Sequence, residues 1–203
     1  MHELSSVIVS KLAVGPMSNN VYLLRCRRTG KQLLIDAAAE PERIMALIGP
    51  DGLSGVVTTH RHADHWGALA DVVHDTGAPT YAGALDMDAI PVPTDHPLQH
   101  GDRISFGDVT LEALHLRGHT PGSIALLFED PDGPPHLFTG DCLFPGGVGK
   151  TWSPEDFESL LADVESRIFH RLPDTTWVYP GHGDDTTVGN ERPHLHDWRQ
   201  RRW

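Results

Sequence analysis

The chain has 203 residues, which is enough for one domain of ordinary size or at most two small ones. Acidic residues outnumber basic ones 28 to 16, and the resulting charge of −12 excludes a protein that binds nucleic acid through a basic face. Only 2 Cys are present, which excludes a disulfide framework and a cysteine-rich zinc module, whereas His occurs 14 times. No segment reaches the roughly 18 apolar residues of a membrane span, and the N-terminus lacks a secretory signal. We therefore expect a cytoplasmic protein without membrane contact.

Short apolar runs separated by turn residues predict strands in the first half, at 7–12, 20–25, 32–36, 53–59 and 79–82. A helix is predicted over 41–48, where Pro41 occupies a tolerated early position. A second helix is predicted to begin with Asp64 as its N-cap and to end at Gly77. The three Pro residues within 91–97 predict a loop.

The second half continues the alternation of strands and helices. A hairpin turns at Gly107-Asp108, and further strands are predicted at 123–129, 136–140 and 176–179. The clearest helix covers 153–171, with Ser153 as its N-cap. The alternation predicts a single α/β layered domain over residues 1–203.

The segment 59–65 reads Thr-His-Arg-His-Ala-Asp-His and directly follows a predicted apolar strand. Neutral imidazole and carboxylate are ligands that Zn²⁺ and Fe²⁺ accept. Gathering so many polar groups at the end of an apolar strand is costly unless a metal or hydrogen bonds satisfy them. The spacing therefore predicts a metal site rather than a run of surface histidines.

Three further candidate ligands lie at the ends of predicted elements: His119 in Gly-His-Thr-Pro-Gly, Asp141 in Thr-Gly-Asp, and His182 in Pro-Gly-His-Gly. Each has Gly beside it, which allows close approach of the backbone. Cys142 is interpreted as a small buried apolar residue. Five further histidines are expected at the surface: His74, His96, His100, His136 and His170. His115 is expected to be at most adjacent to the site.

In this order, Asp36 and the segments 59–65, 118–123, 139–144 and 179–183 resemble the signatures of the metallo-β-lactamase superfamily. Residues 140–151, Gly-Asp-Cys-Leu-Phe-Pro-Gly-Gly-Val-Gly-Lys-Thr, are similar to the type II glyoxalases, the hydroxyacylglutathione hydrolases. Residues 186–194 are similar to their single-domain relatives. The resemblance implies a four-layer αβ/βα sandwich with metals at the sheet edges.

The resemblance also implies a role for each matching residue. His60, His62 and His119 would hold one metal ion, and Asp64, His65 and His182 a second. Asp141 would bridge the two ions, while Asp36 would support the site by hydrogen bonds. The ions are expected to be zinc, with iron and manganese as the alternatives that the same ligands accept.

The expected chemistry is hydrolysis by a hydroxide that bridges the metals, with Asp64 and Asp141 as catalytic residues. Two divalent ions, two carboxylates and one hydroxide leave a charge of about +1, and such a site lowers the pKa of bound water toward ~7. A thiolate, whose parent thiol has a pKa near ~8.5, leaves without much acid assistance. This chemistry fits a thioesterase that acts on a small-molecule substrate.

The glyoxalase resemblance places Lys150 at the carboxylate end of the substrate, and Trp152 is expected to wall the same pocket. The helical C-terminal domain that completes the glutathione pocket of two-domain glyoxalases is expected to be absent. The preferred substrate is S-acylglutathione or a similarly acidic thioester. The alternatives are an iron-dependent persulfide dioxygenase, a lactonase or other ester hydrolase, and a non-catalytic binding module. The oligomeric state is not readable from the sequence.

Overall fold

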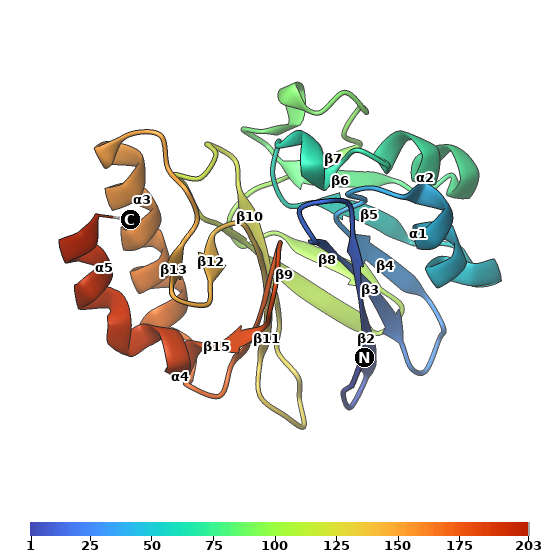
Figure 1. Cartoon of the computed structure of the whole chain (residues 1–203). Helices are drawn as coiled ribbons and strands as arrows, with labels where there is room; N and C mark the ends of the chain where they lie inside the picture. The colour runs from blue at the N-terminus through green and yellow to red at the C-terminus, as the bar shows by residue number, and fades with distance from the viewer. Residues whose placement is uncertain (203) are drawn as a thin grey trace.

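The computed structural model describes residues 1–202, in which two large β-sheets lie face to face and helices cover the outer side of each (Figure 1). The first sheet has the strand order β1-β2-β3-β4-β5-β6-β7. Its strands are β1 (His2–Glu3), β2 (Val7–Val14), β3 (Asn19–Cys26), β4 (Gln32–Ile35), β5 (Gly55–Thr58), β6 (Thr80–Gly83) and β7 (His96–Leu98). The first four are antiparallel neighbours, whereas β4 to β7 run parallel to one another.

The second sheet has the order β15-β14-β11-β10-β9-β8. Its strands are β8 (Arg103–Phe106), β9 (Val109–His115), β10 (Ile124–Phe128), β11 (His136–Gly140), β14 (Trp177–Pro180) and β15 (Thr186–Thr187). Strands β11 and β14 pair in parallel. A separate hairpin of β12 (Leu143–Phe144) and β13 (Gly147–Val148) follows β11.

The helices of the first half cover the first sheet, and those of the second half cover the second sheet (Figure 1). They are α1 (Pro41–Ile48), α2 (Leu69–Thr76), α3 (Pro154–Val164), α4 (Val188–Glu191) and α5 (Leu195–Arg201). This is the predicted four-layer αβ/βα sandwich. No helix within residues 1–202 is long and apolar enough to cross a membrane.

Strand β10 shows why the central strands read as continuous apolar runs. All five of its residues are buried, because one face meets the other sheet and the opposite face meets helices. Ile124, Leu126 and Phe128 pack in the core between the sheets. Ala125 and Leu127 pack in the cluster that contains the apolar side of α3. Successive side chains of a strand point to opposite faces of the sheet, so β10 contributes side chains to two different cores.

Three details of the predicted elements were wrong. His96–Leu98 forms a strand despite Pro97, which is tolerated because β7 is the last strand of its sheet. Asp64 is not an N-cap: it lies in a 3-10 turn (Ala63–His65), and α2 begins only at Leu69. The long helix begins as predicted with Ser153, whose Oγ accepts from the Asp156 N–H at 3.1 Å, but it changes to a π-helical turn at Glu165–Phe169.

Candidate metal centre

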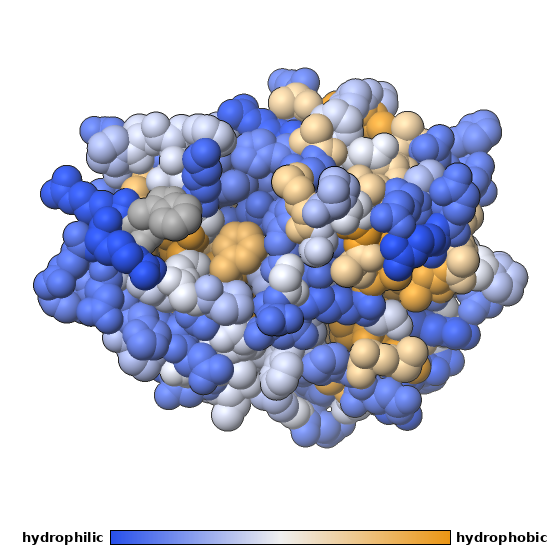
Figure 2. Space-filling view, viewed as in Figure 1, coloured by the Kyte–Doolittle hydropathy of each residue, from blue (hydrophilic) through white to orange (hydrophobic). Residues whose placement is uncertain are grey.

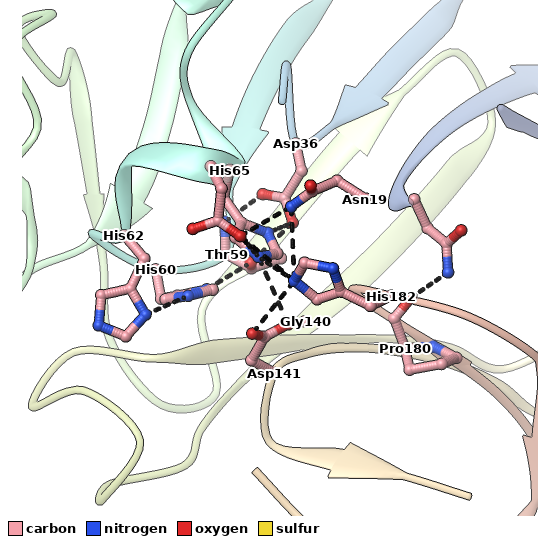
Figure 3. Close-up of polar contacts among 12 residues, drawn as sticks. Asn19, Asp36, Thr59, His60, His62, His65, Gly140, Asp141, Pro180 and His182 are labelled. Carbon is pink, nitrogen blue, oxygen red and sulfur yellow. Dashed lines mark hydrogen bonds and ion pairs between the residues drawn. The ribbon is translucent and has the colours of Figure 1, made fainter. Parts of the chain in front are cut away.

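The candidate residues lie on loops that follow strand ends at one edge shared by both sheets (Figure 3). Asp36 directly follows β4, and residues 59–65 follow β5, its parallel neighbour. Asp141 directly follows β11, and His182 lies two residues beyond β14, again a parallel pair. His119 belongs to the loop between β9 and β10. Because the carboxyl ends of parallel strands share one edge of a sheet, residues distant in sequence converge there.

His60, His62 and His119 form one group whose ring nitrogens point toward one another. His60 Nε2 lies 3.0 Å from His62 Nδ1 and 3.2 Å from His119 Nε2. His60 and His119 are buried, and His62 is partly exposed. Three nitrogen donors in one place are enough to hold one metal ion with a position left open.

Asp64, His65 and His182 form a second group. Asp64 Oδ2 lies 3.3 Å from His182 Nε2 and 3.5 Å from His65 Nε2. The Nε2 atoms of His65 and His182 are 3.2 Å apart. The 3-10 turn at Ala63–His65 therefore directs the Asp64 carboxylate to the site.

Asp141 lies between the two groups. Its carboxylate oxygens lie 3.4 Å from His65 Nε2, 3.4 Å from His182 Nε2 and 3.6 Å from His119 Nε2. Gly181 permits this approach, because a Cβ there would lie 2.2 Å from Asp141 Oδ1. The structure thus brings all of the sequence-predicted ligands together, with Asp141 close to members of both groups.

Hydrogen bonds on the outer side of the cluster determine which ring nitrogens carry protons. His119 Nδ1 donates to the Lys150 carbonyl at 2.7 Å, and His182 Nδ1 donates to the Met17 carbonyl at 3.0 Å, because a carbonyl can only accept. His65 Nδ1 donates to Asp36 Oδ2 at 2.8 Å. In each neutral ring the proton therefore lies on the outer nitrogen, and the lone pair of Nε2 points inward.

His60 follows the same rule through Thr59. The Thr59 hydroxyl donates to Asp36 Oδ2 at 2.8 Å, so its oxygen accepts from His60 Nδ1 at 3.1 Å. Asp36 Oδ1 also accepts the Thr59 N–H at 2.7 Å. The expected supporting hydrogen bonds of Asp36 are therefore present, and they reach both groups.

Burial lowers the pKa of His60, His62 and His119 and keeps these rings in the neutral form that binds metal ions. Burial alone would raise the pKa of Asp141, but its contacts with His182 and His65 hold that pKa well below the usual range. Three neutral donors beside a carboxylate form a ligand set of the kind that divalent zinc or iron accepts.

The charges around His65 also favour a cation. Burial opposes a positive charge on this ring, but Asp36 and Asp141 outweigh it and raise the pKa of His65 to about 10. In addition, Asp141 Oδ1 is buried and has no hydrogen-bond partner among the described residues. Inward lone pairs and an unpaired carboxylate oxygen repel one another unless a cation lies between them. The residues present therefore fit divalent metal ions.

Sequence reasoning missed Asn19. Its buried side chain donates from Nδ2 to Asp64 Oδ2 at 2.8 Å and lies 3.4 Å from His182 Nε2. The backbones of Asn19 and His182 also form an isolated β-bridge. The available signal was the pair Asn19-Asn20 at the start of an apolar strand, where polar side chains need buried partners.

Asp86 was also missed. This buried carboxylate accepts from the backbone N–H of Arg61 at 3.0 Å and of Gly122 at 2.9 Å. It also accepts from the Thr120 hydroxyl. Asp86 therefore ties the loop that carries His60 and His62 to the loop that carries His119.

Lys150 lines the pocket that contains His119, Asp141 and His182, whereas Trp152 lines a neighbouring pocket. Lys150 Nζ lies 4.4 Å from the centre of the Trp152 ring, and that ring lies 6.5 Å from the His62 ring. Trp152 is 66% exposed, so it is not a core residue. Their loop is held against the metal ligands, because a Cβ on Gly149 would lie 1.7 Å from the Asp141 carbonyl oxygen.

The other sequence interpretations had mixed outcomes. Cys142 is buried, as expected, and burial raises its thiol pKa. His115 lies outside the cluster, where its Nε2 donates to the Pro121 carbonyl at 2.7 Å. The surface prediction for His136 was wrong: the ring is only 4% exposed, because helices and the first sheet cover both faces of β11.

Comparison with known proteins places these features in a family. The family model for the metallo-β-lactamase superfamily matches residues 14–182. Hydroxyacylglutathione hydrolase from Polaromonas sp. is 36% identical over 180 residues, and the match covers 87% of this chain and 66% of that protein. The chain therefore spans just under two thirds of the length of that relative.

Solved structures resemble the whole of this fold. TTHA1623 in a di-iron-bound form is 36% identical with a TM-score of 0.75, covering 91% of this chain and 97% of that one. ETHE1 from Myxococcus xanthus is 29% identical with a TM-score of 0.79, covering 93% of this chain and 83% of that one.

Proposed function

Since this chain belongs to the metallo-β-lactamase superfamily and is a metallohydrolase, we propose that it is a binuclear thioesterase. The proposed substrate is S-acylglutathione or a similarly acidic thioester. The observation that carries the proposal is the position of Asp141 between two groups of ligands whose inward lone pairs are set by outer hydrogen bonds. One isolated metal ion would need only one such group.

The proposed ligand assignment follows the two groups. His60, His62 and His119 would hold the first ion, Asp64, His65 and His182 would hold the second, and Asp141 would serve as a ligand shared by the two groups. Bound divalent zinc supplies an acidified water as the nucleophile and a Lewis acid for the carbonyl oxygen. Iron and manganese remain alternatives to zinc, and the di-iron form of TTHA1623 supports iron as a metal for this type of site.

The chain's own residues orient and limit the reaction. Asn19 donates a hydrogen bond to Asp64 Oδ2. This contact fixes the oxygen beside His65 and His182, the other two members of the second group. Lys150 lines the pocket next to the metal ligands and Trp152 stacks on its ammonium group, and both are proposed to contact the substrate. A thiolate leaving group, with a thiol pKa near ~8.5, departs without a dedicated proton donor, which favours thioesters over ordinary esters. The resemblance to hydroxyacylglutathione hydrolases supports the same substrate class.

The test compares substrate classes on one metal-loaded preparation. We expect S-lactoylglutathione to be hydrolysed at least ~100-fold faster, as kcat/KM, than a simple lactone, because the lactone keeps its poorer alkoxide leaving group. Addition of a chelator should abolish the activity and zinc should restore it. Faster turnover of the lactone would overturn the thioesterase assignment in favour of an ester hydrolase.

An iron-dependent persulfide dioxygenase is the second candidate, because a 36% identical relative holds iron. This alternative requires oxygen as a co-substrate. Oxygen uptake with glutathione persulfide, together with no thioester hydrolysis by the same iron-loaded protein, would favour it. Turnover of neither substrate class would favour a non-catalytic binding module.

A further inference from the structure

Helix α3 carries an acidic side chain on its buried side. Its apolar residues Leu160, Leu161 and Val164 pack in the core cluster of the second sheet and its helices. The surface of this helical layer, at the left of Figure 2, is mainly hydrophilic. Asp163 is nevertheless only 3% exposed. Because a buried carboxylate is costly unless charged or polar groups satisfy it, Asp163 needs specific partners.

The main partner of Asp163 is Arg117, which lies two residues before the candidate ligand His119. Asp163 Oδ2 accepts from the Arg117 backbone N–H at 2.9 Å and from its Nε at 2.8 Å, and Oδ1 accepts from its Nη2 at 2.7 Å. Burial alone would raise the pKa of Asp163, but the contacts with Arg117 hold that pKa below its usual range. The charged carboxylate therefore binds both the backbone and the guanidinium fork of Arg117.

The next residue, Gly118, brings the same loop directly against α3. Its φ of +134° is a conformation that favours glycine. A Cβ at this position would lie 2.2 Å from the Asp156 carbonyl oxygen and 2.7 Å from Leu160 Cβ, both of which belong to α3. The two residues immediately before His119 are thus held by α3, one through an ion pair and the other through close packing.

The His119 ring is held at its other end as well. Its Nδ1 donates to the Lys150 carbonyl at 2.7 Å, and its Nε2 lies 3.2 Å from His60 Nε2. Asp163 belongs to neither candidate group of metal ligands. It can therefore act on the metal centre only through the backbone that carries His119.

We propose that Asp163 is a positioning residue, which through Arg117 sets the direction of His119 and thereby the affinity for the first metal ion. This inference rests on the ligand assignment of the proposed function and adds a buried ion pair of α3 to it. A histidine whose ring turns away from its metal ion loses part of that bond, whereas ligands on other loops keep theirs. The ion pair should therefore affect one ion and spare the other.

The test variant is Asp163→Asn, which keeps the shape of the side chain and removes its charge. No buried charge is left without a partner, because the Arg117 side chain is 54% exposed and can be hydrated. Metal-free protein is titrated with zinc in competition with a chromophoric chelator. We expect the affinity for one ion to fall about five- to tenfold, below the ~10- to 100-fold typical of a group bonded directly to a ligand. The affinity for the other ion should stay within about twofold of the wild type.

Two comparisons identify which ion is affected. Asn19→Ala acts on the second group of ligands, so it and Asp163→Asn should weaken different binding steps. The hydrogen-bonded Nδ1 proton of His119 is followed by NMR of the zinc-loaded protein. Asp163→Asn should shift this resonance and leave the Nδ1 proton resonance of His182 in place.

Glu112→Gln is the matched control, because it breaks a similar ion pair away from the loop of His119. Glu112 in β9 accepts from Arg171 Nη1 at 2.7 Å and from Nη2 at 2.6 Å. Arg171 lies just beyond the π-helical turn that follows α3. Both zinc affinities of this variant should equal those of the wild type. Arg117→Lys keeps the positive charge without the planar fork, and it should weaken the same step as Asp163→Asn.

The outcomes separate this inference from the proposed function, because none of them requires turnover. Selective loss of one zinc affinity together with the shifted His119 resonance supports the role of Asp163 even if no thioester is hydrolysed. An unchanged zinc titration of Asp163→Asn overturns that role even if thioesters are hydrolysed. Equal weakening of both steps in Asp163→Asn and in Arg117→Lys also overturns it, because the ion pair would then support only the fold.

Discussion

The carboxylate of Asp36 holds the ring of His65: Oδ2 accepts from Nδ1 at 2.8 Å, and both side chains are buried. Asp36 reaches this position because its backbone adopts a left-handed conformation, φ 58°, directly after β4. The contact fixes the direction of His65 Nε2 and increases the basicity of the ring. The proposed second metal ion therefore depends on a residue that does not touch it.

Replacing this carboxylate should weaken metal binding more than it weakens the fold. We expect Asp36→Asn to lower zinc affinity by about 10- to 100-fold, because the amide keeps the shape but not the charge that polarises His65. Competition with a chromophoric chelator measures the change. Asp95→Asn is the matched control, because Asp95 also accepts from a threonine N–H and hydroxyl, those of Thr80, but lies outside the metal-binding groups. Equal affinities of the two variants would contradict the role assigned to Asp36.

Asn19 is expected to affect the binding of one of the two ions selectively. Its Nδ2 contacts Asp64 and His182 of the second group, and among the described residues it forms no hydrogen bond with His62 or His119 of the first. Asn19→Ala should therefore lower the affinity for the second zinc ion about tenfold and leave the affinity for the first unchanged. Stepwise calorimetric titration of metal-free protein separates the two affinities. Equal weakening of both steps would indicate general loss of structure.

Asn20→Ala serves as the comparison for this variant. Asn20 donates to the carbonyls of Pro180 and Gly183, which supports the loop that carries His182 without touching a proposed ligand atom. We expect Asn20→Ala to lower the melting temperature of the protein. The variant should still bind zinc in two distinct steps, with the same order of affinity as the wild type.

The bridging position of Asp141 predicts an asymmetry between two further variants. Asp141→Ala should reduce thioester hydrolysis by at least ~100-fold, because both ligand groups lose a shared carboxylate. His115→Ala should reduce it by less than about threefold, because this ring only contacts the Pro121 carbonyl. Rates are measured at saturating zinc. Similar losses in the two variants would mean that the ligand set is wrong.

His136 is expected to make the fold sensitive to acid. Burial lowers the pKa of this ring from 6.5 to about 4, and its Nε2 has no partner among the described residues. Between these two pH values the unfolded chain binds a proton that the folded chain does not, so the free energy of unfolding falls as the pH drops. The shift corresponds to a loss of about 3 kcal/mol from this residue by pH 4.

Urea unfolding of chelator-treated protein at pH 7.5 and 4.5 tests this expectation. His136→Phe retains an aromatic ring beside Tyr179 and Phe128 but cannot take up a proton. The variant should lose less stability than the wild type between the two pH values. Equal losses would show that other groups account for the acid sensitivity.

The sequence was most informative where chemistry is local. Residues 59–65 carry four ligand-type side chains in one short segment, and the flanking glycines identified the remaining candidates. Asn19 could not be assigned in this way, because its role arises from a β-bridge to His182, far along the chain. His136 was misplaced because short apolar runs do not show that both faces of a strand are covered.

Two metal ions are proposed to act together in thioester hydrolysis. The most direct test is the rate of S-lactoylglutathione hydrolysis during stepwise addition of zinc to metal-free protein. We expect no activity without metal and a rate that levels off at about two ions per chain. A rate that levels off at about one ion, or that persists in excess chelator, would contradict it.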